Sequence, residues 1–150
     1  MEKQLQVSAI KDGTVIDHIP TKALFKVIKI LQLEECSQMI TFGNNLDSKA
    51  MQTKAIIKIA NRFFADEEVN KIALVAPNAK LNTIRDYEVI EKRVVTTPKE
   101  IIGIVSCFNP KCITNVENIK TRFEVLSNKP FTMKCFHCEK ITNENEMTYL

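Results

Sequence analysis

The last third of the chain contains two short cysteine-rich stretches, CFNPKC at residues 107–112 and CFHC at residues 135–138. They give the spacing C-x4-C, a gap of 22 residues, and C-x2-C. Two thiol pairs brought together by a short intervening fold can supply four thiolates at the corners of a tetrahedron, about 2.3 Å from a Zn²⁺ ion. The spacing therefore predicts one zinc site built from Cys107, Cys112, Cys135 and Cys138.

Two other interpretations of these cysteines stay open, namely four buried and reduced thiols without a metal, or two disulfides. Paired short spacings favour the metal site, because they are typical of zinc-binding stretches in intracellular chains. A site closed by four cysteines has no position for an activated water, so we expect a structural metal and not a catalytic one. His137 could compete as a ligand, but its place directly before Cys138 favours the surface. Cys36 is left over and is expected to be an ordinary thiol.

The composition is that of a folded protein, with 150 residues of which 45% are hydrophobic and 26% charged. The net charge is +3, and the basic residues outnumber the acidic ones by only 14 to 12 up to Pro98 and by 7 to 6 after it. Neither part has the basic excess expected of a nucleic-acid binder. No apolar run reaches the length of a membrane span, and the first residues lack a signal-peptide pattern. These features predict a cytoplasmic protein without a membrane or nucleic-acid partner.

The first two thirds of the chain alternate between strand and helix patterns. Apolar and polar residues alternate with period two in the predicted strands, and apolar residues recur with helical spacing in the two predicted helices. We expect strands at residues 5–10, 14–19, 38–46, 54–61, 80–84 and 87–92, and helices at 21–31 and 66–75. The strand at residues 38–46 should end in a turn at Gly43-Asn44-Asn45. This order predicts an α+β fold of the split βαβ, or ferredoxin-like, type, with two helices on one face of an antiparallel sheet.

The stretch Thr96-Thr97-Pro98-Lys99 is typical of a linker. We therefore expect two domains, residues 1–96 and residues 97–150, the second all-β with short strands at 101–105, 121–126 and 132–134. A domain of about fifty residues has too little core to be comfortably stable alone. Zinc would supply the difference, since its binding contributes on the order of 10–16 kcal/mol of apparent folding free energy in small zinc-finger peptides.

Three parts of the sequence together resemble the regulatory chain of aspartate carbamoyltransferase: GTVIDHIP at residues 13–20, the segment Asn82–Lys92, and the four-cysteine tail. The resemblance extends from Leu5 to the end of the chain. It implies a non-catalytic allosteric subunit of pyrimidine biosynthesis whose first domain binds ATP as activator and CTP, with UTP, as inhibitors. It also implies that the zinc domain docks onto catalytic chains, and that regulatory chains pair as homodimers.

Carried over by motif, the resemblance assigns the nucleotide site to Ala9, Ile10, Val15, Asp17, His18, Lys58, Asn82, Ile84, Tyr87, Val89 and Lys92, with Lys54 as a weaker member. The chemistry of these residues agrees with such a site. Lys58 and Lys92, on separate strands, can converge on a triphosphate, and His18 can donate a further bond. Asp17 can accept a bond from a ribose hydroxyl or an exocyclic amine. Backbone groups of Ala9, Ile10, Ile84 and Tyr87 can recognise the base.

The same residues also allow ordinary structural roles and other functions. Lysines on strands usually face solvent, and His18 and Tyr87 could be an ordinary loop histidine and strand aromatic. A nucleic-acid-binding zinc ribbon is the alternative function, and the even charge balance disfavours it. An enzyme is disfavoured because the chain shows no Gly-rich phosphate loop and no nucleophile next to a base. Gln4 and Ser8 stand where the best-known family member has a lysine and a glutamate, and Lys3 could replace the first.

Overall fold

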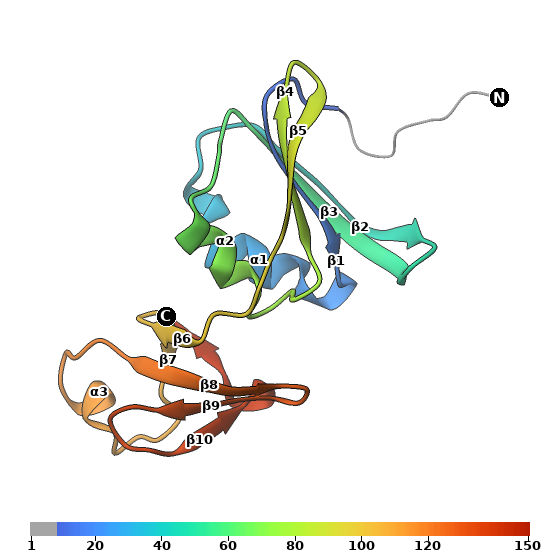
Figure 1. Cartoon of the computed structure of the whole chain (residues 1–150). Coiled ribbons are helices and arrows are strands. Elements are labelled where there is room, and N and C mark those ends of the chain that lie inside the picture. Colours follow the sequence, from blue (N-terminus) through green and yellow to red (C-terminus); the bar gives the residue numbers. More distant parts are fainter. Residues whose placement is uncertain (1–8) are drawn as a thin grey trace. The chain divides into compact units, whose positions relative to one another are not determined.

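The computed structural model describes residues 9–150, and these form two compact units that divide between Thr96 and Thr97. Each unit contains its own antiparallel sheet, as Figure 1 shows. No helix among the described residues is long and apolar enough to cross a membrane. The predicted change of composition at residues 96–99 coincides with the division between the units.

The first unit is a five-stranded antiparallel sheet with helices between its strands, within the part of the chain that the structure describes. The sheet order is β2-β3-β1-β4-β5. Because β1 lies between β3 and β4, the chain follows the split βαβ order of the ferredoxin-like fold, and β5 adds a further strand beside β4. The predicted α+β class and its topology are confirmed. In chain order the elements are β1 (Gly13–Ile19), η1 (Thr21–Ala23), α1 (Leu24–Ile30), η2 (Leu33–Glu35), β2 (Ile40–Ser48), β3 (Gln52–Ala60), α2 (Asp66–Ile72), β4 (Lys80–Arg85) and β5 (Glu88–Val94).

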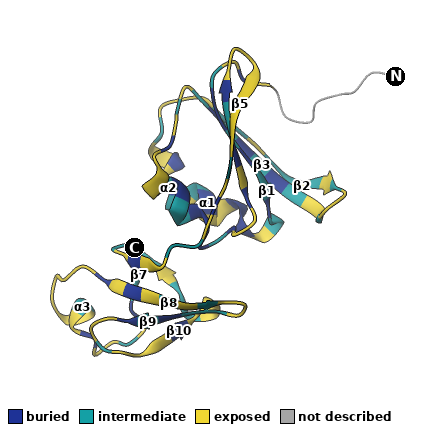
Figure 2. Ribbon diagram, viewed as in Figure 1, coloured by how far each residue is buried: buried dark blue, intermediate teal, exposed yellow. Residues whose placement is uncertain are grey.

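The core of the first unit lies between one face of this sheet and the helices α1 and α2 (Figure 1). Strand β3 shows the contrast between the faces, because Ala55, Ile57 and Ile59 are completely buried while Lys58 and Ile56 are half-buried. Helix α1 adds Leu24 and Val27 to the same core. Figure 2 shows the buried parts of the strands and helices in dark blue. Side chains alternate between the two faces of a strand, so Val15 and Asp17 on β1, Lys58 on β3 and Asn82 on β4 fall on the face that the helices leave open.

Two local predictions were wrong in the first unit. Gly43-Asn44-Asn45 is not a turn that ends a strand, since β2 runs through it to Ser48. Its pairing with β3 shifts between Gly43 and Leu46, so the left-handed conformation of Asn45 is absorbed as a bulge. Tyr87 is not in a strand, because the turn falls one residue later than expected.

Of the strand predicted at residues 5–10, Ala9 and Ile10 belong to no strand, and residues 5–8 lie outside the described residues.

At the β4–β5 turn, Asp86 and Tyr87 both have positive φ, which is the backbone of the tight two-residue hairpin turn. The hairpin therefore presents Tyr87 at its tip, where the side chain is 67% exposed.

The second unit is almost entirely β, as predicted. It contains a four-stranded sheet of order β10-β9-β8-β6 and the separate pair β11-β7, within the described residues. The only helical pieces described there are the short α3 and a 3-10 turn. Its elements are β6 (Glu100–Ile102), β7 (Val105–Ser106), α3 (Ile113–Val116), β8 (Arg122–Asn128), β9 (Phe131–Cys135), β10 (Ile141–Asn143), η3 (Glu144–Glu146) and β11 (Thr148–Tyr149).

Few large side chains are completely buried in the second unit. They are Ile101, Val105, Phe123 and Met133. Cys107, Cys112 and Cys135 are buried as well. The first unit buries a far larger apolar cluster. The second unit therefore depends more strongly on whatever its cysteines bind.

Candidate metal centre and nucleotide site

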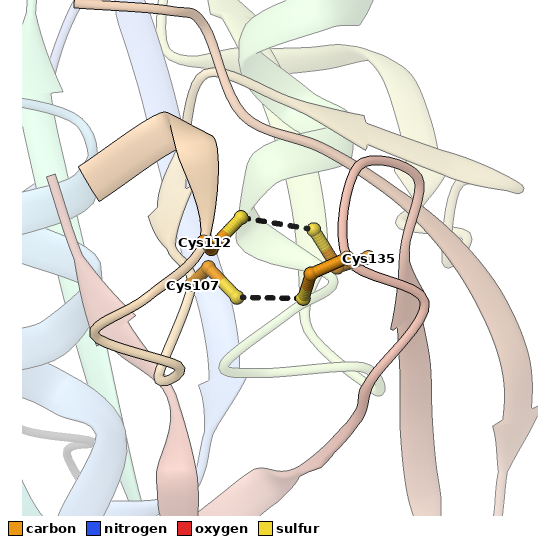
Figure 3. A group of neighbouring side chains, drawn as sticks. Cys107, Cys112 and Cys135 are labelled. Atoms are coloured by element: carbon orange, nitrogen blue, oxygen red, sulfur yellow. Dashed lines mark hydrogen bonds between the residues drawn. The ribbon is translucent and has the colours of Figure 1, made fainter. Parts of the chain in front are cut away.

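The four predicted cysteines converge in the second unit (Figure 3). Their Sγ atoms all lie within 4.8 Å of one another, with 3.6 Å between Cys107 and Cys138 and 3.8 Å between Cys112 and Cys135. A tetrahedron with metal–sulfur distances of about 2.3 Å has sulfur–sulfur edges of about 3.8 Å, so the group fits a tetrahedral ion. All four thiols are free, which excludes the two disulfides that the sequence left open.

The first cysteine pair is presented by a tight loop that leads into α3. The side-chain Oδ1 of Asn109 accepts the N–H of Lys111 at 3.1 Å, and its backbone carbonyl accepts the N–H of Cys112 at 3.0 Å. Cys112 then caps the N-terminus of α3. The hydroxyl oxygen of Thr114 lies 3.2 Å from the Sγ of Cys112, so it can donate a hydrogen bond to a thiolate there.

The second pair is presented by the turn that joins β9 to β10. The N–H of Cys135 donates to the carbonyl of Lys140 at 2.9 Å, and the N–H of Glu139 donates to the carbonyl of Cys135 at 2.9 Å. Glu139 adopts a positive φ of 62°, which closes the turn around Cys138. His137 is exposed and stacks edge-on against Phe136, away from the sulfur group, in agreement with the surface position expected for it.

The thiols differ in how readily they lose a proton. Desolvation by burial raises the pKa of Cys107 and of Cys135. Burial also acts to raise the pKa of Cys138, but hydrogen bonds from the backbone N–H of Lys140 and from the Asn109 side chain outweigh it and lower that pKa to about 7. Buried thiols next to one another are costly to ionise alone, and a divalent cation at their centre removes that cost.

The predicted nucleotide residues are not clustered in the sequence, yet the strand register places several of them in one row. Lys58 on β3 pairs with Val15 on β1, Val15 pairs with Asn82 on β4, and Asn82 pairs with Lys92 on β5. Cross-strand partners point to the same face of a sheet. Val15 and Lys58 are half-buried on the face that the helices leave open. Four of the eleven predicted residues therefore form a continuous row on that face.

The two lysines of this row are separated by three strand spacings, which places their backbones about 14 Å apart. Long side chains can reach inward from both ends of such a row toward one bound anion. Desolvation by burial lowers the pKa of Lys58, while the charge of Asp17 acts in the opposite direction. Part of the water around the Lys58 ammonium is thus already displaced, which reduces the cost of binding a phosphate there.

Asp17 and His18 lie on one side of the row, beyond Val15 along β1, where this strand is irregular. The pairing of β1 with β3 shifts between Ile16 and Ile19, and His18 has a positive φ of 58°. The bulge makes both side chains half-buried on the open face, although neighbours in a regular strand would point to opposite faces. Lys54 forms a 2.9 Å ion pair with Asp17, whose Oδ1 also accepts the backbone N–H of His18 at 2.6 Å.

The imidazole of His18 has one polar atom that the fold does not satisfy. Its Nδ1 is buried and has no hydrogen-bond partner among residues 9–150, and it lies 3.6 Å from the Asp17 carboxylate. A buried polar nitrogen without a partner is costly unless a ligand or an ordered water completes it.

On the other side of the row lie the β4–β5 hairpin and the segment that leads into β1. The N–H of Tyr87 donates to the carbonyl of Lys11 at 2.9 Å, and the N–H of Asp86 donates to the Asp12 carboxylate at 3.1 Å. Ile10 and Ile84 are buried but belong to no part of the main cluster beneath the helices. Ala9, Tyr87 and Val89 are exposed on this side. Backbone groups of Tyr87 were predicted to recognise the base, and of these the N–H is already used by the fold.

Some neighbours of the predicted nucleotide residues could not be identified from the sequence. Thr41 on β2 extends the row beyond Lys58, and Lys80 pairs with Asp17, but both facts depend on strand register. Lys54 was named as a weaker member, and only the structure gives it a defined partner. Gln4 and Ser8 lie outside the described residues.

Comparisons with known proteins cover both units. The family model described as "Aspartate carbamoyltransferase regulatory chain, allosteric domain" matches residues 5–96, and the one described as "Aspartate carbamoyltransferase regulatory chain, metal binding domain" matches residues 99–148. The chain is 53% identical over 149 residues to the aspartate carbamoyltransferase regulatory chain of Bacteroides thetaiotaomicron, covering 99% of this chain and 97% of that protein. The protein of the same description from Parabacteroides distasonis is 51% identical over 146 residues, covering 97% and 95%. That from Pyrococcus abyssi is 49% identical over 146 residues, covering 96% of each chain.

Proposed function

This chain belongs to the family of aspartate carbamoyltransferase regulatory chains, and we propose that it binds ATP as activator and CTP, with UTP, as inhibitors on the open face of its first unit. It is a regulatory, non-catalytic subunit with an allosteric domain and a metal-binding domain. We place it in the cytoplasm, where it passes the effect of nucleotide binding to catalytic chains in pyrimidine biosynthesis.

The observation that carries the nucleotide proposal is the row Lys58–Val15–Asn82–Lys92 on the open face. A triphosphate needs cations, and charge-assisted hydrogen bonds to phosphate are among the strong ones in proteins. Lys58 and Lys92 supply those cations, and Asn82 between them can both donate and accept. The row crosses the strands, and Asp17, two residues beyond Val15 on β1, extends the site along the strand.

The two sides of the row differ in ways that suit the two ends of a nucleotide. The side with Asp17, His18 and Lys54 is ionic and carries the unsatisfied Nδ1 of His18. The hairpin side is apolar, with Ile10 and Ile84 buried and Tyr87 exposed. We assign the base to the hairpin side and the phosphates to the lysines. Backbone groups on the hairpin side can bond both the adenine and the cytosine amine, so opposing effectors can share one site.

For the second unit we propose one structural Zn²⁺ held by Cys107, Cys112, Cys135 and Cys138. Four thiolates in tetrahedral arrangement suit Zn²⁺, and the site is closed to water because protein occupies all four positions. The ion would supply folding free energy and no step of a reaction. Elemental analysis of the purified chain should find one zinc per chain, and iron in its place would contradict this assignment.

The partners proposed for the chain are catalytic chains, which the second unit contacts, and a second regulatory chain. Several apolar side chains near the cysteine loops are exposed and would be buried by docking, namely Phe108, Ile113, Val116 and Phe136. In the first unit, exposed Phe25 and Phe42 pack edge to face with ring centroids 6.1 Å apart, beside the edge strand β2. Such surface is typical of interaction sites.

Reconstitution tests the proposed function. Catalytic chains would be assayed over a range of aspartate concentrations, alone and after mixing with this chain, each with and without ATP and CTP. We expect a larger complex in which ATP raises and CTP lowers activity at low aspartate, while the catalytic chains alone do not respond. A complex that forms but ignores both nucleotides would contradict the effector proposal, and the absence of a complex would contradict the partner proposal.

A further inference from the structure

We propose that Asn115 is a positioning residue of the metal centre, whose side-chain amide holds the first cysteine loop in the conformation that presents Cys107 and Cys112 to the ion. The inference rests on the metal-binding role proposed above. It concerns a residue that is not a ligand and that the cysteine spacing does not reveal.

The amide of Asn115 connects two points of the loop. Its Nδ2 donates to the backbone carbonyl of Cys107 at 2.8 Å and to that of Asn109 at 2.7 Å. Carbonyl oxygens only accept hydrogen bonds, so only the NH₂ end of the side chain can satisfy both. The two acceptors therefore fix the orientation of the amide and use both of its hydrogens.

The other hydrogen bonds described in the loop do not join Cys107 to the helix. The backbone N–H of Asn109 bonds to the Cys107 Sγ, which is a contact within the start of the loop. The bond from Cys112 N–H to the Asn109 carbonyl and the bond from Lys111 N–H to the Asn109 side chain close residues 109–112 only. The bond from Asn115 to the Cys107 carbonyl joins the start of the loop to the helix that follows its end. Without it, Cys107 could move relative to Cys112 before the metal arrives.

The role of Asn115 is local to this loop and is not one of packing. Asn115 is exposed, and α3 contains only the four residues Ile113–Val116, none of them buried. A short exposed helix of this kind gains little from the core of the unit. The loop and the helix are therefore held to each other mainly by the amide and by the bonds from α3 to Cys112.

Loss of the amide should weaken metal binding because two ligands must then be ordered when the ion binds. Removing the outer groups that orient metal ligands typically lowers affinity by about 10–100-fold. We expect Asn115→Asp to show this loss, since it keeps the shape of the side chain while replacing the NH₂ donor with a second acceptor oxygen. Asn118→Asp is the control for charge, because Asn118 is also exposed and adds the same negative charge three residues further along.

The experiment uses the full chain and measures Zn²⁺ affinity by competition with a chromophoric chelator, and the thiolate-to-metal absorption of the Co²⁺ form. Thr121→Val is the control for general destabilisation, since it removes the buried bond from the Thr121 hydroxyl to the Val105 carbonyl in the same unit without touching the loop. We expect Asn115→Asp to lower Zn²⁺ affinity about 10–100-fold and to change the Co²⁺ absorption, while Asn118→Asp stays within about threefold and Thr121→Val keeps the wild-type Co²⁺ spectrum.

Two results would overturn the inference: a Zn²⁺ affinity of Asn115→Asp within about threefold of wild type, or a loss of affinity with an unchanged Co²⁺ spectrum, which would assign Asn115 to general stability. If Asn115→Asp takes up no metal, Asn115→Ala, which lacks the amide but adds no charge, decides by the same criteria. Failure of the wild-type chain itself to bind Zn²⁺ would contradict the proposed cofactor and is distinguishable from both results.

Discussion

The two units of the chain differ in what stabilises them. In the first, one face of a five-stranded sheet is covered by two helices, and the buried cluster includes Ile16, Leu24, Ile57 and Leu81. In the second, a few large side chains such as Phe123 and Met133 lie in a small β structure together with the buried cysteines. Apolar burial is the main driving force of folding in ordinary domains, whereas very small domains need a metal or disulfides.

The source of stability determines where each unit can hold its functional residues. The first unit has a complete core on one side of its sheet, so the other side can carry polar groups such as the Lys58 ammonium and the His18 imidazole. In the second unit three of the four clustered cysteines, Cys107, Cys112 and Cys135, are themselves part of the buried interior. Loss of a ligand should therefore leave the first unit folded and unfold the second. The following predictions test this contrast.

Removal of a metal ligand should have the largest effect. Cys135→Ser takes away one of four thiolates from a site whose ion contributes on the order of 10–16 kcal/mol in comparable small domains. We expect loss of zinc, unfolding of residues 97–150 and loss of binding to catalytic chains. Circular dichroism and limited proteolysis should still reveal a folded fragment that ends near Thr96 and binds nucleotide. Normal assembly by a metal-free Cys135→Ser chain would contradict the contrast.

A substitution at Gly13 should affect the first unit alone. Gly13 has a φ of 141°, and a Cβ there would lie 2.1 Å from the backbone carbonyl oxygen of Ile59. Because neither backbone can move without disturbing the central strands, Gly13→Ala should lower the free energy of unfolding of the first unit by about 2–4 kcal/mol. Denaturant unfolding followed in that unit would measure the loss, and zinc content should stay unchanged. Equal destabilisation of both units would show that they do not fold independently.

The third prediction concerns nucleotide binding. A charge-assisted bond to phosphate is worth roughly 1.5–3 kcal/mol, so Lys58→Ala should weaken ATP and CTP binding about tenfold or more. Calorimetric titration of the full chain would measure this. Lys26→Ala removes the same charge from an exposed position on α1 and should bind both nucleotides as wild type does. Zinc content and assembly should be unaffected in both variants.

Coupling between effector and substrate sites is typically only about 1–3 kcal/mol. The Lys58→Ala complex should therefore lose most of its response to both nucleotides. If that complex still responds fully to ATP and CTP, the nucleotide site lies elsewhere.

The smallest effect is expected at Thr114. Its hydroxyl lies 3.2 Å from the Cys112 Sγ, where it can donate to a metal-bound thiolate. Thr114→Val keeps the shape of the side chain and removes that donor, so Zn²⁺ affinity should fall by less than about tenfold, corresponding to one hydrogen bond of about 0.5–1.5 kcal/mol. Thr114→Ser retains the hydroxyl and should restore wild-type affinity. A Val variant with a higher affinity than wild type would show that the contact does not stabilise the thiolate.

Much of the fold could be predicted from the sequence because the two faces of the sheet differ in polarity. The alternation in β1 and β3 and the apolar spacing of α1 follow directly from burial on one side only. At Gly43-Asn44-Asn45 the composition indicated a turn, but pairing with β3 continues across a bulge. Local residue preference is a weak guide where an edge strand can absorb a left-handed residue.

The two sites differ in the same way. The four cysteines are recognisable because the two members of each pair are close in the sequence and only 22 residues separate the pairs. The row Lys58–Val15–Asn82–Lys92 depends on the register of four strands, which is set by tertiary pairing. Only the resemblance to a known family suggested these residues beforehand. Asn115 had no signal beyond its place three residues after Cys112.

The central claim is that nucleotides occupy the open face of the first sheet. The most direct test is to titrate CTP into the isotope-labelled, zinc-loaded full chain and follow the amide resonances. We expect saturable shifts of the amide resonances of Val15, Lys58, Asn82 and Lys92, while the amide resonances of residues 107–138 keep their positions. Shifts confined to the helices or to the cysteine unit, with the open face unaffected, would contradict the central claim.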